Sequence, residues 1–215
     1  MPLFSRKKEP EGPPRGGLGR ELAFPPAMSP EEQSQVSAAF AAVRPKRVIE
    51  WGSGGSTLLF PALYDTIERY VSVEHNEAWH ARVEQHIDTS RVEVLFRPPA
   101  EADPEPPMFK EGGKGKTLPE YAQWSDRAER DRSIMANYID APFERIASPD
   151  LTLVDGRARR FCIEAAWSAL PSGGVLVVHD AQRGQYIEKI EAVCGGRGEW
   201  MLPWSRGQVC IARKP

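Results

Sequence analysis

Three polar residues that end apolar segments are placed to do acid–base chemistry. Asp155 ends the segment LTLVD, while His179 and Asp180 end the segment GGVLVVHD. If both segments are parallel strands, their carboxyl ends border the crevice in which such sheets bind ligands. A histidine there has an unperturbed pKa near 6.5, which suits a general base. We therefore predict that Asp155, His179 and Asp180 are catalytic. A histidine that only forms structural hydrogen bonds is the alternative.

A glycine-rich turn, EWGSGGS at residues 50–56, follows one apolar segment and opens a helical one. Glycine lets the backbone turn sharply and approach a ligand closely. The helix that follows presents unpaired N–H groups and the positive end of its dipole. The turn therefore predicts binding of a nucleotide or a carboxylate, with a plain strand-to-helix turn as the alternative.

The residues around this turn discriminate between nucleotides. Glu74 ends the segment YVSVE, twenty positions after Gly54, where a carboxylate accepts hydrogen bonds from ribose hydroxyls. Thr57 stands where a dinucleotide fingerprint needs a small residue, and Glu50 would repel a pyrophosphate. A carboxylate at Glu50 instead suits the cationic methionine end of S-adenosylmethionine. An NAD-dependent oxidoreductase is thus disfavoured.

Four motifs in this order, E-x-G-x-G-G-S, VEHN, VDG and GGVLVVHD, resemble those of the Rossmann-like (class I) S-adenosylmethionine-dependent methyltransferases over about residues 29–213. The resemblance implies a role in cofactor binding for six residues. Gly52 and Gly54 would lie under the methionine and ribose, Glu50 would hold the amino group and Ser56 the methionine carboxylate. Glu74 would bind the ribose hydroxyls, with His75 beside the adenine.

Within this family, the segments that end in VDG and HD resemble the small-molecule O-methyltransferases. That resemblance implies a hydroxyl of a small molecule or sugar as the acceptor. It also implies Mg²⁺ bound by Asp155 and Asp180, although Ala181 stands where a third ligand would be. A methyltransferase without the metal, with His179 as the base, is the alternative route.

Two further inferences concern the substrate and the activity. Arg157 directly follows VDG, and a guanidinium facing the crevice would bind an acidic substrate.

Ala181 and the lack of a recognisable adenine motif after residue 96 favour a second class of protein. In that class the fold binds S-adenosylmethionine without transferring its methyl group and serves in regulation.

The elements that must position these residues alternate along the chain. The pattern predicts an α/β fold with a doubly wound, mostly parallel sheet of the Rossmann-like methyltransferase type. The last two strands are close in sequence and predict an antiparallel edge strand. Strands are expected at 47–50, 70–74, 91–96, 151–155, 174–179 and 208–213, with a short one at 200–202. Helices are expected from residue 29 to Pro45, and at 57–63, 77–87, 161–170 and 186–193.

Two segments depart from this alternation. Residues 1–22 are poor in apolar side chains and predict a disordered N-terminal tail, leaving residues 23–215 as the methyltransferase-like domain. Residues 97–148 form an expected insertion over the carboxyl edge of the sheet, with a lineage-specific solvated loop as the alternative. Its first half is expected to be disordered or lid-like, and its second half to hold a charged helix at 125–138.

The composition limits the kinds of molecule that this protein is expected to bind. The formal net charge is −2 and the hydrophobic fraction 40%, which gives no electrostatic footprint for nucleic acid. No apolar run has the length of a membrane span. The three cysteines form no CxxC pair, so a reducing cytoplasm is the expected setting. A small-molecule acceptor is the expected partner, and the oligomeric state stays open.

Overall fold

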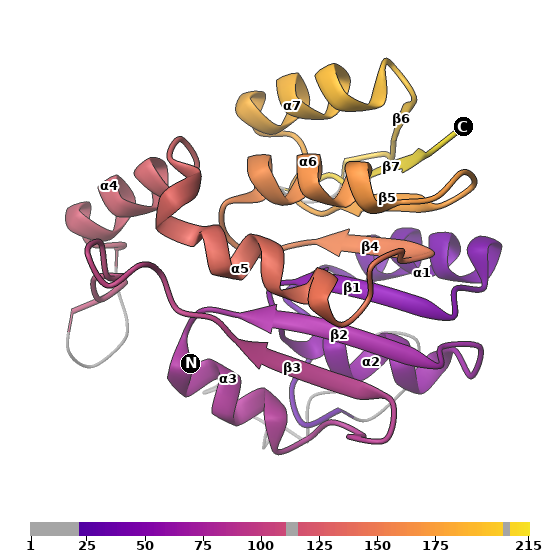
Figure 1. The fold of residues 1–215 in the computed structure, drawn as a ribbon, viewed down its shortest axis with the longest axis horizontal. Coiled ribbons are helices and arrows are strands. Elements are labelled where there is room, and N and C mark those ends of the chain that lie inside the picture. Colours follow the sequence, from indigo (N-terminus) through magenta and orange to yellow (C-terminus); the bar gives the residue numbers. More distant parts are fainter. Residues whose placement is uncertain (1–21, 111–115, 204–206) are drawn as a thin grey trace, which may run out of the picture.

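Seven strands form one sheet at the centre of the fold in a computed structural model, which describes residues 22–110, 116–203 and 207–215 (Figure 1). The strand order is β3-β2-β1-β4-β5-β7-β6. The first five of these strands are parallel, and β7 runs antiparallel to both β5 and β6. The expected doubly wound sheet with an antiparallel edge strand is therefore confirmed. The strands are β1 (Arg47–Trp51), β2 (Arg69–Glu74), β3 (Val92–Phe96), β4 (Leu151–Val154), β5 (Val175–Val178), β6 (Gly198–Trp200) and β7 (Cys210–Arg213).

Helices cover both faces of the sheet because successive side chains of a strand point to opposite faces. On β5, Leu176 and Val178 pack in one core with residues of α5, α6 and α7, while Val175 and Val177 pack in the other with α1 and α2. The helices are α1 (Pro30–Val43), α2 (Gly55–Leu63), α3 (Glu77–Glu84), α4 (Pro119–Ala128), α5 (Ala136–Asp140), α6 (Arg159–Ala169) and α7 (Gly184–Cys194).

Helix α1 begins with a capping box formed by Ser29 and Glu32. The Ser29 side chain accepts a hydrogen bond from the Glu32 N–H, and Glu32 Oε2 accepts one from the Ser29 N–H at 2.8 Å. Two of the unpaired N–H groups at the start of the helix are satisfied in this way. The arrangement uses only one oxygen of Glu32, and the other oxygen faces the sheet.

The expected charged helix at 125–138 is wrong. Helix α4 begins earlier and ends at Ala128, and two 3₁₀ turns, Arg132–Met135 and Ala141–Glu144, flank α5. The break occurs because Asp131 Oδ1 accepts hydrogen bonds from the N–H and hydroxyl groups of Ser133, which starts a new turn. Helix α4 lies beyond the arrowheads of the strands, whereas α5 packs on the sheet (Figure 1).

The rest of the insertion is irregular where the structure describes it, and part of it lines the main cavity. The expected tail at residues 1–22 falls outside the described residues except for Leu22, whose side chain packs beside the core.

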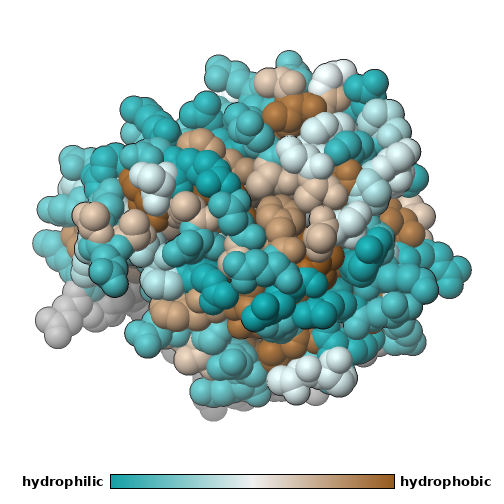
Figure 2. Space-filling view, viewed as in Figure 1, coloured by the Kyte–Doolittle hydropathy of each residue, from teal (hydrophilic) through white to brown (hydrophobic). Residues whose placement is uncertain are grey.

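The surface is mainly polar. In Figure 2, hydrophilic residues surround smaller apolar areas toward the middle of the visible face. Within the described ranges, no helix combines the length and apolar character needed to cross a membrane.

We expect Leu153→Ala to lower the free energy of unfolding by about 2–5 kcal/mol, because it leaves a cavity in the central strand β4. Leu153 is fully buried, whereas Leu202 is 81% exposed. Urea unfolding monitored by circular dichroism measures the loss. Leu202→Ala is the matched control and should leave stability nearly unchanged; equal losses for the two variants would contradict this account of the core.

Candidate functional site

A cavity of about 780 Å³ opens at the carboxyl ends of the central parallel strands. This volume is within the range of roughly 300–1,000 Å³ typical of small-molecule sites. The turn after β1, the end of β2 and the turns after β4 and β5 each contribute residues to its wall. Nine of the ten predicted site residues line it: Gly52, Gly54, Ser56, Glu74, His75, Asp155, Arg157, His179 and Asp180.

The glycine turn fits tightly against the loop after β4 on one side and is open on the other. Gly52 has a φ of +96°, and a Cβ there would lie 2.6 Å from the Cα of Gly156. By contrast, a Cβ on Gly54 would meet no atom within 4 Å. Gly52 is therefore required by its own backbone conformation and by contact with Gly156. Gly54 leaves room in the cavity above the start of α2.

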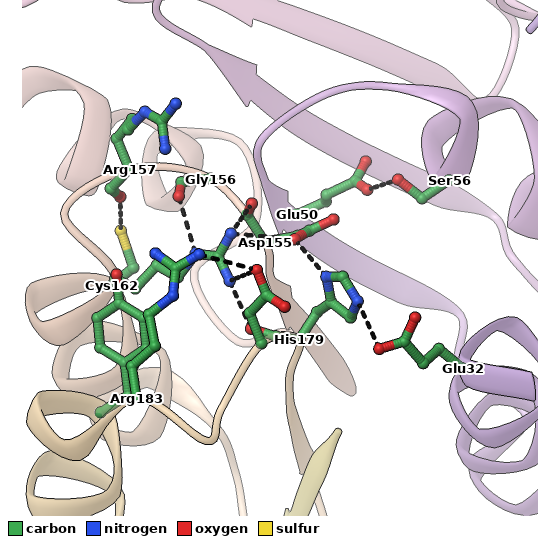
Figure 3. Close-up of polar contacts among 12 residues, drawn as sticks. Glu32, Glu50, Ser56, Asp155, Gly156, Arg157, Cys162, His179 and Arg183 are labelled. Atoms are coloured by element: carbon green, nitrogen blue, oxygen red, sulfur yellow. Dashed lines mark hydrogen bonds and ion pairs between the residues drawn. The ribbon is translucent and has the colours of Figure 1, made fainter. Parts of the chain in front are cut away.

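Glu50 is the predicted site residue that does not line the cavity. It is fully buried beneath the glycine turn. Its carboxyl group accepts a hydrogen bond from Ser56 at 2.5 Å (Figure 3), and others from Thr57 at 2.5 Å and Ser72 at 2.8 Å. Burial raises the pKa of Glu50 to about 7, although the hydrogen bonds from these three hydroxyls oppose the rise. The geometry makes Glu50 a support for the turn, and its predicted contact with the methionine amino group stays untested.

Glu74 and His75 form one end of the cavity. Glu74 Oε1 accepts hydrogen bonds from the N–H groups of His75 and Asn76, at 2.9 and 2.8 Å, which fixes the carboxylate at the end of β2. His75 Nε2 lies 3.1 Å from Glu105 Oε1, and the insertion thereby reaches the site. Burial alone would lower the pKa of His75, but the hydrogen bonds with Glu105 and Glu74 outweigh it and raise the pKa to about 9. His75 is thus a cation held between two carboxylates.

His179 lies between two carboxylates at the other end of the cavity (Figure 3). Its Nδ1 is 2.7 Å from Asp155 Oδ1, and its Nε2 is 3.3 Å from Glu32 Oε1. Neither His179 Nε2 nor Glu32 Oε1 makes a hydrogen bond, although both atoms are buried. Burial lowers the pKa of His179, but the charge of Asp155 and its hydrogen bond raise it above 6.5 overall. Asp155 therefore orients the ring and stabilises its protonated form.

A second cavity of about 340 Å³ adjoins the first. His179, Asp180 and Arg183 border both cavities, whereas Ser29, Glu32 and Gly207 border only the second. Glu32 on α1 and His179 at the end of β5 both border it, and the two buried atoms that face each other lie 3.3 Å apart. The first cavity extends to the glycine turn and the second to Glu32, and His179 stands between them.

The two carboxylates predicted as metal ligands form ion pairs with arginines. Asp155 Oδ1 lies 3.2 Å from a guanidinium nitrogen of Arg159, and Asp180 Oδ2 lies 3.8 Å from Arg159 and 3.1 Å from Arg183. Ala181 supplies no third ligand, and the described residues include no group of three or more His, Cys, Asp and Glu side chains placed to hold a metal ion. These residues do not fit a divalent metal.

Arg157 lines the first cavity, as the sequence predicts, but its side chain points away from Asp155 (Figure 3). Its guanidinium donates a hydrogen bond to the hydroxyl of Tyr121 on α4 and lies 5.4 Å from the centre of the Tyr121 ring. An acidic substrate remains a prediction for this residue.

Sequence reasoning missed four residues that shape the site. The segment Ser29-Pro30-Glu31-Glu32 indicates only a helix cap for Glu32, and Arg157 stands nearer to VDG than Arg159 does. Glu105 and Tyr121 lie in the insertion, where no periodic pattern indicates which side chains face inward. No local signal indicates that Arg159 turns toward Asp155, because residues 155–158 precede α6, which begins at Arg159.

Comparison with known proteins supports the fold. No protein-family model matches this chain, and no curated protein matches it in sequence. Among solved structures, a methyltransferase-like protein from Silicibacter pomeroyi is 18% identical with a TM-score of 0.54, and the match covers 88% of each chain. The MycE methyltransferase of the mycinamycin biosynthetic pathway, in complex with Mg, SAH and mycinamycin VI, is 15% identical with a TM-score of 0.51. The match covers 85% of this chain and 45% of that one.

A methyltransferase whose name refers to RNA has the same fold. The 16S rRNA N2 G1207 methyltransferase of T. thermophilus, in complex with AdoMet and guanosine, is 14% identical with a TM-score of 0.52. The match covers 88% of this chain and 44% of that one. The chain therefore has the Rossmann-like fold of class I methyltransferases. Identities this low establish the fold alone.

We expect Glu50→Gln to remove a pH dependence from the stability of the protein. The folded protein keeps the proton of Glu50 up to about pH 7, whereas the unfolded chain loses it near 4.5. Protonated Glu50 therefore contributes its full stabilisation to the folded state at pH values below 4.5. The free energy of unfolding falls by about 3 kcal/mol as the pH rises from 4.5 to about 7. Urea unfolding at both ends of the window measures the difference between wild type and variant. Parallel pH profiles would contradict the assignment.

Proposed function

We propose that this protein is an S-adenosylmethionine-dependent methyltransferase that acts on a hydroxyl of a small molecule or sugar. The observation that carries the proposal is one cavity with two chemically distinct ends. At one end an open glycine turn lies beside a fixed carboxylate, and at the other a buried histidine is held by Asp155. The fold supports the proposal, because this arrangement lies at the carboxyl edge where the sheet binds ligands.

The residues present fit the cofactor. Gly54 leaves space above the turn, the start of α2 presents its N–H groups, and Glu74 is fixed at the end of β2 with its side chain on the cavity wall. Glu74 would hold the ribose hydroxyls and the turn the methionine moiety. When bound, S-adenosylmethionine supplies a methyl group on a positively charged sulfur.

His179 would accept the proton of the acceptor hydroxyl. Asp155 takes the Nδ1 side of the ring, which leaves Nε2, 3.3 Å from Glu32 Oε1, as the atom that would accept the proton, and His179 borders both cavities. Asp155 also stabilises the charge that the ring gains. Holding the hydroxyl close to the methyl donor and in line with it would provide most of the rate enhancement.

A small molecule is favoured over RNA as the acceptor. The second cavity is of about 340 Å³ and contains both acidic and basic side chains, and the chain has a net charge of −2. A phosphate backbone is bound by clustered Lys and Arg side chains instead.

We expect Glu74→Ala to weaken binding of S-adenosylmethionine and S-adenosylhomocysteine at least tenfold, equivalent to about 1.4 kcal/mol, because the ribose loses its carboxylate partner. Isothermal titration calorimetry measures both affinities. Glu84→Ala, on an exposed side chain at the end of α3, is the control and should bind as wild type does. A folded wild-type protein that binds neither compound at millimolar concentration would refute the proposal.

We expect His179→Gln to slow methyl transfer by about 10²-fold or more while leaving cofactor affinity within a factor of three, because a general base is lost. Release of S-adenosylhomocysteine with a panel of phenols, catechols and sugars measures the rate. Cofactor binding without turnover on any acceptor would favour the alternative of a non-catalytic, regulatory protein. Unchanged turnover in His179→Gln would remove the histidine from the mechanism.

A further inference from the structure

Five oxygen atoms from the ends of two strands surround the guanidinium of Arg159. Its Nε donates to the Gly156 carbonyl at 2.9 Å, one terminal nitrogen to the His179 carbonyl at 2.5 Å, and the other to the Asp155 carbonyl at 2.7 Å. The carboxylates of Asp155 and Asp180 lie at 3.2 and 3.8 Å. We call these five oxygens the oxygen cage.

The side chain in this cage is fixed. Arg159 is 5% exposed at the first turn of α6, and its guanidinium carbon also lies 5.7 Å from the centre of the Tyr186 ring. A buried guanidinium is stabilised only where acceptors satisfy its donors and opposite charge compensates it. The cage meets both needs, since carbonyls take the hydrogen bonds and carboxylates supply the charge.

Carbonyl and carboxylate oxygens are also the ligands that hard divalent cations prefer. We propose that Arg159 is a built-in cation, which fills an oxygen cage that would otherwise suit a divalent metal, so that the site works without one. The two carboxylates that the sequence suggests as metal ligands are thereby assigned to a guanidinium.

What this inference implies for catalysis rests on the proposed function. The oxygen cage itself does not depend on that function. With the cation supplied by the chain, no metal bridges the acceptor to Asp155 and Asp180. The acceptor would then need one hydroxyl within reach of His179, and no second oxygen placed to chelate a metal. Arg159 is a positioning residue, because it holds the carbonyl of His179 and the carboxylate of Asp155.

Binding of Mn²⁺, followed by electron paramagnetic resonance of the full-length protein, tests the proposal without any acceptor. We expect wild type to bind no Mn²⁺ at submillimolar concentration. Arg159→Ala should gain a site at least tenfold tighter than any in wild type. Millimolar guanidinium should displace that Mn²⁺, because it refills the cage, and a second substitution, Asp155→Asn, should abolish the site.

Two further variants keep the test decisive. Arg159→Gln retains much of the side-chain volume if Arg159→Ala does not fold, and Arg160→Ala is the matched control, since Arg160 hydrogen-bonds with Glu129 outside the cage. Wild-type binding of Mn²⁺ that Asp155→Asn abolishes would overturn the proposal. So would folded Arg159 variants that bind Mn²⁺ no better than Arg160→Ala. Calorimetry with S-adenosylhomocysteine tests the proposed function separately.

Discussion

The charge of one nearly buried carboxylate organises this end of the molecule. Burial opposes ionisation of Asp155, yet His179 when protonated, through its charge and its hydrogen bond, and the guanidinium of Arg159 outweigh burial and lower the pKa of Asp155. The partners come from different elements, His179 from the end of β5 and Arg159 from the start of α6. Compensating this charge therefore fixes the ends of β4 and β5 and the first turn of α6 relative to one another. The geometry of the candidate site and the local fold therefore have the same electrostatic cause.

The insertion, residues 97–148, also helps to form this end of the molecule. The Trp51 indole donates a hydrogen bond to the Ile139 carbonyl of α5 at 3.2 Å, which ties the insertion to the end of β1. A Cβ on Gly156 would lie 1.9 Å from the Tyr138 hydroxyl, so α5 packs directly on the loop that follows β4. At the end of the cavity beside β2, Glu105 lies 3.1 Å from His75 and completes its environment. The insertion is therefore part of the core and of the site, and more than a cover over the sheet edge.

Much of the fold could be predicted because its signals are local. The alternation of strands, the glycine turn and the capping box each depend on neighbouring residues, and the structure has all three. The helix at 125–138 could not be placed correctly, because a single aspartate cap at Asp131 divides a charged segment whose composition is uniformly helical. Nine of the ten residues predicted for the site line one cavity, but their pairings depend on contacts far apart in sequence. Nothing local indicates that Glu32 faces His179, or that Arg159 rather than Arg157 turns toward Asp155.

Glu32 uses its two oxygens for two separate purposes, one for the helix cap and one for the histidine. Its second oxygen also occupies the space where a side chain at position 207 would begin, since a Cβ on Gly207 would lie 1.9 Å from it. Three segments that are distant in the sequence thus share one small volume. A side chain added at position 207 would have to move the Glu32 oxygen that faces His179. Glutamate at one position and glycine at the other are expected to be inherited together wherever the histidine is kept.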